Sequence, residues 1–81
     1  MIEIVFEGSE EQRARVRTIA QESGLAEEII EKDGVDGAEI IRITLQYGPD
    51  ILKVLTSLVV LVEECIKARS AYNITFKNKK R

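Results

Sequence analysis

The sequence contains no histidine and no tryptophan, and it has only one cysteine, one proline, two tyrosines and two phenylalanines. Without histidine the chain lacks the commonest general base, the commonest metal ligand and the histidine-dependent nucleophilic triads. A single cysteine forms neither an internal disulfide nor a zinc site. The five glycines are dispersed, so no phosphate-binding glycine motif is present. These absences predict that the protein is not an enzyme and has no cofactor and no bound metal.

Charge and hydrophobicity argue against two classes of partner. The formal net charge is −2, so no bulk field attracts the chain to nucleic acid or anionic lipid. The longest apolar-rich stretch, residues 51–62, would span roughly 18 Å as a helix, short of the ~30 Å core of a bilayer. Met1 leads directly into a strand pattern, without the segments of a secretory signal. Together with the single thiol, these features predict a cytoplasmic protein with no membrane span.

The spacing of apolar residues changes twice from a period of two to a period near 3.6. Ile2, Ile4 and Phe6 alternate with polar residues before the pattern becomes helical at Ser9. Residues 41–47 alternate again, and a second helical pattern follows. A period of two indicates a strand with one wet face, and a period of 3.6 indicates an amphipathic helix. The chain therefore reads as two strand–helix–strand halves.

Local signals place the helix boundaries. Ser9 and Gln12 are spaced as a capping box and Gly24 suits a left-handed helix end, so the first helix is predicted to end near residue 23. Pro49 suits the first position of a second helix, which is predicted to end near residue 69. Cys65 lies on the apolar arc of this helix, which favours a buried structural thiol over a nucleophile.

The segment from residue 25 to residue 31 is ambiguous between a strand and a short helix. Two turn signals follow it, Asp33-Gly34 and Asp36-Gly37, and a clear strand pattern resumes after them. Such dipeptides commonly close a hairpin, so a strand is the favoured interpretation. If the segment is helical instead, the sheet loses one strand.

This order of elements predicts an α+β ferredoxin-like fold, βαββαβ, with a four-stranded antiparallel sheet and two helices on one face. We predict the spatial strand order four, one, three, two, a single domain over residues 1–77 and a basic tail at residues 78–81. The residues expected beneath the helices are Ile2, Ile4, Phe6, Ile41, Ile43, Leu45, Tyr72, Ile74 and Phe76. The open face is expected to carry Glu3, Val5, Glu7, Ile40, Arg42, Thr44, Gln46, Asn73, Thr75 and Lys77.

Protein–protein contact is the function that the pattern favours. The second helix has an apolar arc of about 200°, wider than one sheet face needs to cover, so its flanks are predicted to stay exposed. The two predicted sheet edges carry opposite charge, and unpaired edges are templates for strand addition. We therefore predict an interaction or adaptor module, with a homodimer as one form of it. The candidate contact residues are Leu52, Val60, Leu61, Ala68, Lys77, Lys79, Lys80 and Arg81.

Two other functions stay open at this point. A weak nucleic-acid-binding domain would use Arg13, Arg17 and the basic tail, but the open face is expected to lack the aromatic residues that stack on bases. Nucleic acid is therefore the less favoured partner. A small-molecule regulatory module would hold its ligand at the rim between helices and sheet or at a subunit interface.

The run AEIIRITLQYG-PDILKVLTSLVVLVEECIKAR-SAYNITFKN resembles the C-terminal half of the effector-associated constant components of bacterial conflict systems. It shares with them an apolar strand, a glycine-containing turn, a long apolar helix ending in basic residues, and a final strand. The resemblance implies a component of an NTPase-linked defence module that is not itself an enzyme. A de novo designed domain is the alternative origin, although Cys65 and the irregular surface pattern favour a natural sequence.

Overall fold

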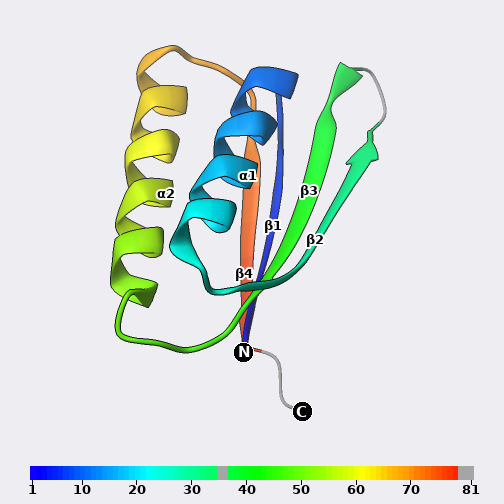
Figure 1. Ribbon diagram of the computed structural model, residues 1–81. Helices are drawn as coiled ribbons and strands as arrows, with labels where there is room; N and C mark the ends of the chain where they lie inside the picture. The colour runs from blue at the N-terminus through cyan, green and yellow to red at the C-terminus, as the bar shows by residue number, and fades with distance from the viewer. Residues whose placement is uncertain (35–36, 79–81) are drawn as a thin grey trace.

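The computed structural model describes residues 1–34 and 37–78. Six elements follow one another along the chain: β1 (Ile2–Gly8), α1 (Glu10–Ser23), β2 (Ala26–Asp33), β3 (Glu39–Leu45), α2 (Ile51–Lys67) and β4 (Asn73–Asn78). The four strands form one antiparallel sheet in the order β2-β3-β1-β4, and both helices lie on the same side of it (Figure 1). The predicted fold class and strand order are confirmed, and the ambiguous segment is a strand.

The central strands β1 and β3 form the base of the core. Their alternation holds as predicted, because Ile4 pairs with Ile43 and Phe6 pairs with Ile41 across the sheet, and all four side chains are fully buried. Thr44 is also buried, on the face of the sheet opposite the two described helices. A slip of one residue in this register would turn the apolar set toward solvent, so the pairing is strongly specified.

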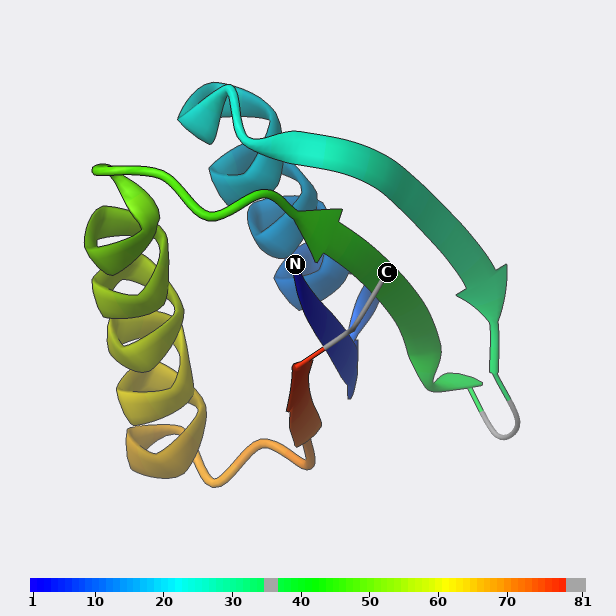
Figure 2. The same cartoon turned by 90° about the horizontal axis from the view of Figure 1, so that it is seen from below.

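The first helix begins and ends at the residues that the sequence indicates. The Ser9 hydroxyl accepts a hydrogen bond from the Gln12 amide at 3.1 Å, and the Gln12 side chain accepts one from the Ser9 amide at 2.9 Å. Gly24 ends the helix with φ of 70°, a conformation that costs glycine little. Val16 and Ala20 are the buried residues of α1, so its apolar stripe is narrow, and the sheet curves around it (Figure 2).

The second helix presents a continuous buried stripe to the core. Val54, Leu58, Leu61 and Cys65 are spaced by four, three and four residues, and each is no more than 3 % exposed. This spacing puts them on one side of a helix, where they pack with the central strands. The stripe occupies only part of the wide apolar arc that the sequence shows, so the remaining apolar residues of α2 are half-buried or exposed.

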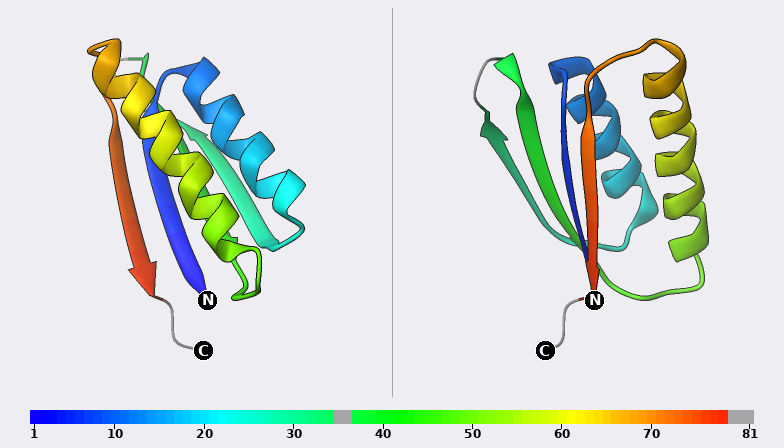
Figure 3. Two further views of the ribbon diagram at one scale, coloured as in Figure 1. Left: turned by 90° about the vertical axis from the view of Figure 1, so that its left-hand side faces the viewer. Right: turned by 180° about the vertical axis from the view of Figure 1, so that it is seen from behind.

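The fourth strand is covered less than predicted. Phe76 pairs with Ile4 and so lies on the helix side of the sheet, yet it is 48 % exposed. Tyr47, which follows β3, is also exposed, and Tyr72 is half-buried. The predicted burial of Phe76 is therefore wrong, because α2 crosses the sheet obliquely and leaves the end of β4 uncovered (Figure 3, left).

Candidate interaction surface

A second apolar stripe runs along the outer side of α2. Its residues, which we call the α2 seam, are Leu52, Leu55, Val59, Val62 and Ile66. They alternate in steps of three and four residues, the heptad spacing by which helices pack on other helices. Leu52 is 70 % exposed, Val59 52 % and Ile66 60 %, while Leu55 and Val62 are half-buried on the side nearer the core. The described residues leave this stripe without a covering element.

A notch adjoins the seam where α2 begins. Its lining comes from four parts of the chain and consists of Ile2, Tyr47, Leu55, Phe76, Lys77 and Asn78, around a volume of about 270 Å³. The Tyr47 hydroxyl donates a hydrogen bond to the Asn78 side chain, which fixes one wall. Leu55 belongs to both the seam and the notch, so the two form one continuous apolar surface.

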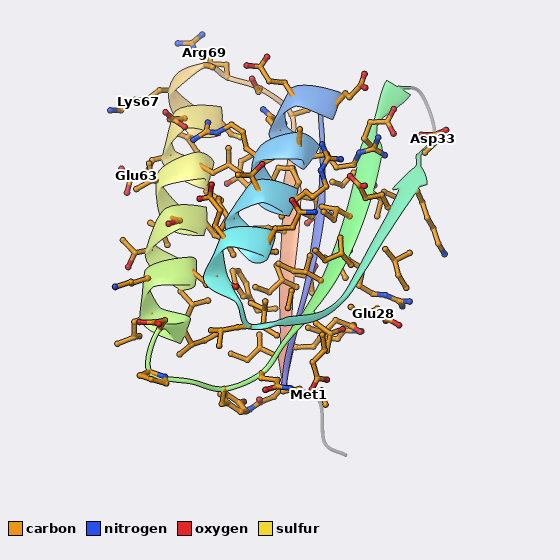
Figure 4. All side chains as sticks on the ribbon, in the orientation of Figure 1. Met1, Glu28, Asp33, Glu63, Lys67 and Arg69 are labelled. Carbon is orange, nitrogen blue, oxygen red and sulfur yellow. The ribbon has the colours of Figure 1, made fainter. Side chains whose placement is uncertain are left out.

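Charged side chains border this surface at the other end. Glu63 and Lys67 project from α2, and Arg69 projects just beyond it (Figure 4). All three are exposed. An exposed apolar stripe with a polar border is a feature that protein-binding patches share.

The residues predicted for contact are distributed unevenly over the structure. Leu52 lies in the seam, Ala68 is exposed just beyond α2, and Lys77 is exposed on β4. Leu61 is 1 % exposed and belongs to the core, so its predicted exposure is wrong. Val60 is exposed, but it lines a groove against α1 instead of the seam. The remaining three candidates, Lys79, Lys80 and Arg81, lie outside the described residues.

Most of the seam was not predicted, because the apolar residues of the second helix form a single wide arc on a helical wheel. The arc contains two heptad-like stripes one residue out of step, and only one can face the sheet. The signal for a second stripe was the repeat of seven residues from Leu52 to Val59 to Ile66. Tyr47 and Phe76 were missed for a different reason, since their exposure depends on where α2 crosses the sheet.

Arg13 is the centre of an ion cluster on the opposite side of the molecule. Its Nη1 lies 2.8 Å from a Glu39 carboxylate oxygen and 3.7 Å from Asp33, and its Nε lies 3.4 Å from Glu31. Nη1 also donates to the Lys32 carbonyl at 3.1 Å. The Arg13 side chain is only 15 % exposed. This arginine therefore joins α1 to the β2–β3 hairpin.

The pKa of Glu39 is raised above its ordinary value. A hydrogen bond with the Asp33 side chain is the largest cause, burial adds to it, and the Arg13 guanidinium opposes both. Two carboxyl groups so close together favour keeping a proton on one of them. Arg13 is the cation that contacts all three carboxylates, those of Glu31, Asp33 and Glu39, and so offsets their mutual repulsion.

Replacing Arg13 with methionine is expected to destabilise the fold by about 1–3 kcal/mol, because the apolar stem is kept while the carboxylates lose their shared cation. Arg17→Met is the matched control, since Arg17 makes one ion pair, 2.7 Å to Glu31, and is more exposed. It is expected to cost less than about 1 kcal/mol. Urea unfolding of both variants measures the difference, and equal costs would contradict the role of Arg13.

The arginines of α1 form ion pairs with other elements of the fold. Arg13 and Arg17 contact β2 or β3, and Arg15 forms an ion pair with Glu64 of α2. These contacts occupy the guanidinium groups that a nucleic-acid-binding surface would need. No observation in the described residues favours that alternative.

An open groove of about 550 Å³ separates the exposed sides of the two helices. Its lining includes Ile19 and Val60 together with Thr18, Thr56 and Arg15. Arg15 is paired with Glu64. The small-molecule alternative would place a ligand here, but the described residues provide no buried polar group aimed into the groove, so nothing fixes what would bind.

Cys65 is buried, and burial is the main reason that the pKa of its thiol is raised. A thiol held in its protonated form is a poor nucleophile. Within residues 1–34 and 37–78, no helix is long and apolar enough to cross a membrane, and no three cysteine or acidic side chains are grouped to hold a metal ion.

No protein-family model matches the chain, and no curated protein matches it. The structure is similar to a putative antibiotic biosynthesis monooxygenase from Deinococcus radiodurans, with a TM-score of 0.57, 10 % identity, and coverage of 100 % of this chain and 94 % of that one. A second antibiotic biosynthesis monooxygenase gives 0.57, 11 % identity and full coverage of both chains. A formyltetrahydrofolate deformylase from Pseudomonas putida KT2440 gives 0.61 and 15 % identity, over 98 % of this chain and 29 % of that one. At these identities the similarity shows the fold alone.

The comparison contradicts the prediction that this chain is not an enzyme. That prediction excluded catalysis because histidine and the nucleotide and metal motifs are absent. The same fold, over nearly the same length, belongs to proteins named as monooxygenases. Fold and activity are separate properties, because a reaction depends on the particular site that a fold carries. The missing histidine and the missing motifs are therefore no grounds for excluding catalysis here.

Proposed function

We propose that this chain is a protein–protein interaction module that self-associates through the α2 seam and the adjoining notch. The observation that carries the proposal is the heptad-spaced apolar stripe that stays outside the core. Leu52, Val59 and Ile66 recur every seven residues, and each is more than half exposed. An isolated monomer gains nothing from repeating large apolar side chains in this way, whereas a second helix gains a packing surface.

The seam is favoured over the sheet edges as the contact surface. Among the described residues, the β2 edge carries Glu27, Glu28 and Asp33, all exposed, and like charges would oppose each other if two such edges met. The β4 edge ends in Lys77 and Asn78, also exposed. Charged edges of this kind usually prevent strand addition.

A second copy is the partner that the surface fits best, because the seam is nearly symmetric about its middle residue and so can pack against itself. A standard interface removes about 800 Å² from each partner, which is roughly 15 % of the 5406 Å² surface of this chain. The seam and notch together extend along the full length of α2, about 25 Å for 17 residues. Burial of Leu, Ile and Phe side chains supplies the driving force.

Sedimentation velocity over a concentration series tests the proposal. The chain of 9.1 kDa is expected to shift from monomer to a species of twice that mass, with a dissociation constant on the order of 10 μM or tighter. A mass that stays monomeric up to about 100 μM would contradict self-association.

The cytoplasmic location and the resemblance to conflict-system components stay predictions, and the single buried cysteine supports a reducing compartment.

A further inference from the structure

We propose that the two copies bind with their α2 helices antiparallel, so that Ile66 of each copy fills the notch of the other. This inference rests on the proposed self-association and adds the geometry of the complex. Three observations support it: the symmetry of the seam, the position of the notch, and the charges at the ends of α2.

The seam is nearly symmetric about Val59. Leu52 and Ile66 lie seven residues to either side, about 10.5 Å along the helix axis, while Leu55 lies four residues before Val59 and Val62 three after it. In an antiparallel pair, Val59 therefore meets Val59, Leu52 meets Ile66, and Leu55 meets Val62. Each γ-branched leucine then meets a β-branched side chain, Ile66 or Val62, and these different shapes let the layers interdigitate.

The notch lies at one end of the seam and a strongly exposed side chain lies at the other. Ile66 is 60 % exposed, whereas the notch beside Leu55, Tyr47 and Phe76 is apolar and unfilled within the described residues. An antiparallel pair places Ile66 of one copy beside Leu52 of the other, one helical turn from Leu55, so that its side chain can enter the notch, twice by symmetry. A parallel pair places both notches at the same end, beside Leu52 of each copy, and leaves the exposed Ile66 of both copies at the far end, away from either notch. Shape complementarity therefore favours the antiparallel arrangement.

Electrostatics favours the same orientation. Lys67 and Arg69 lie at the end of α2 with Glu63 (Figure 4), so a parallel pair would gather four cations and only two Glu63 carboxylates at one end of the complex. An antiparallel pair separates the two groups by the length of the helix. It also aligns the helix dipoles favourably, since the positive end of each α2 lies beside the negative end of the other.

Engineered cysteines distinguish the orientations. Leu52→Cys and Ile66→Cys are prepared separately, mixed, and oxidised gently; both positions are exposed, so neither change disturbs the core. A disulfide needs Cα atoms within about 7 Å of each other. In the antiparallel pair, position 52 of one copy lies beside position 66 of the other, while the two copies of position 52 are roughly 21 Å apart. The mixture is therefore expected to cross-link, and each variant alone is not.

Two further samples serve as controls. Val59→Cys is expected to cross-link with itself, because the two-fold axis passes through that position, and the unmodified chain is expected not to, because Cys65 is buried. Cross-linking of Leu52→Cys with itself would overturn the antiparallel orientation and leave self-association standing. Absence of every cross-link in a chain that sediments as a dimer would overturn the proposed surface. A chain that sediments as a monomer would overturn the proposed function itself.

Discussion

Replacing Val59 with glutamate is expected to weaken self-association at least ~100-fold, whereas the same replacement at Val60 is expected to leave it almost unchanged. In the proposed complex the two copies of residue 59 meet on the two-fold axis. Two glutamates there would bury like charges against each other in an apolar layer, which costs several kcal/mol.

Val60→Glu is a closely matched control. Val59 and Val60 are adjacent on α2, and their exposed fractions are 52 % and 47 %, so the two changes alter helix propensity and surface polarity equally. They differ in direction, since one helical step of 100° turns Val60 toward the groove against α1. Val59 belongs to the seam and Val60 does not, so a difference between the variants in self-association reports on the seam.

Sedimentation velocity and thermal unfolding by circular dichroism measure the two effects. Both variants are expected to melt close to the unmodified chain when all are compared at a concentration where each is monomeric. Equal loss of self-association in both variants would mean that the contact is a general property of α2. No loss in either would place the contact elsewhere on the molecule.

Much of the fold follows from apolar spacing alone. In β1 and β3 the alternation is regular, and both strands lie in the middle of the sheet, so every inward residue from Ile4 to Phe6 and from Ile41 to Leu45 is buried. The strand at residues 26–33 was correctly preferred over a helix, because turn signals and a clear partner strand follow it. Local sequence patterns predict strands and their buried faces correctly where the neighbouring strands and helices require the same alternation.

The exposed surface depends on how the helices lie over the sheet, which local patterns do not encode. Alternation correctly placed Phe76 on the helix side, opposite Ile4, but its exposure depends on the oblique path of α2. The ion pairs of Arg13 join residues up to 26 positions apart, so they cannot be read from its neighbours along the helix. A helical wheel likewise gives the width of an apolar arc without saying which part of it faces the core.

Leu61 and Leu52 show most directly that a helical wheel does not identify the side facing the core. The sequence pattern assigned both residues to the exposed flanks of one apolar arc. Leu61 is 1 % exposed and Leu52 is 70 % exposed. Leu61→Ala is therefore expected to lower the free energy of unfolding by about 2–5 kcal/mol, because it opens a cavity beneath the helix. Leu52→Ala is expected to change it by less than about 0.5 kcal/mol in the monomer.

The two variants should behave in the opposite way toward self-association. Leu52 forms a seam layer with Ile66 of the second copy, so Leu52→Ala is expected to raise the dissociation constant about 10-fold, while the fold stays intact. Urea unfolding has to be measured well below the dissociation constant, because dimer formation adds apparent stability at higher concentration. Under those conditions the cost of each change reports only the packing of the monomer.

The comparison keeps residue type, helix and chemical change constant, so the difference between the two variants depends on the rotation of α2 about its axis. If Leu52→Ala proved costly and Leu61→Ala neutral in the monomer, the helix would face the sheet with its other stripe. The residues from Val54 to Cys65 that now form the core would then become the contact surface, and the seam defined here could not be the site of self-association.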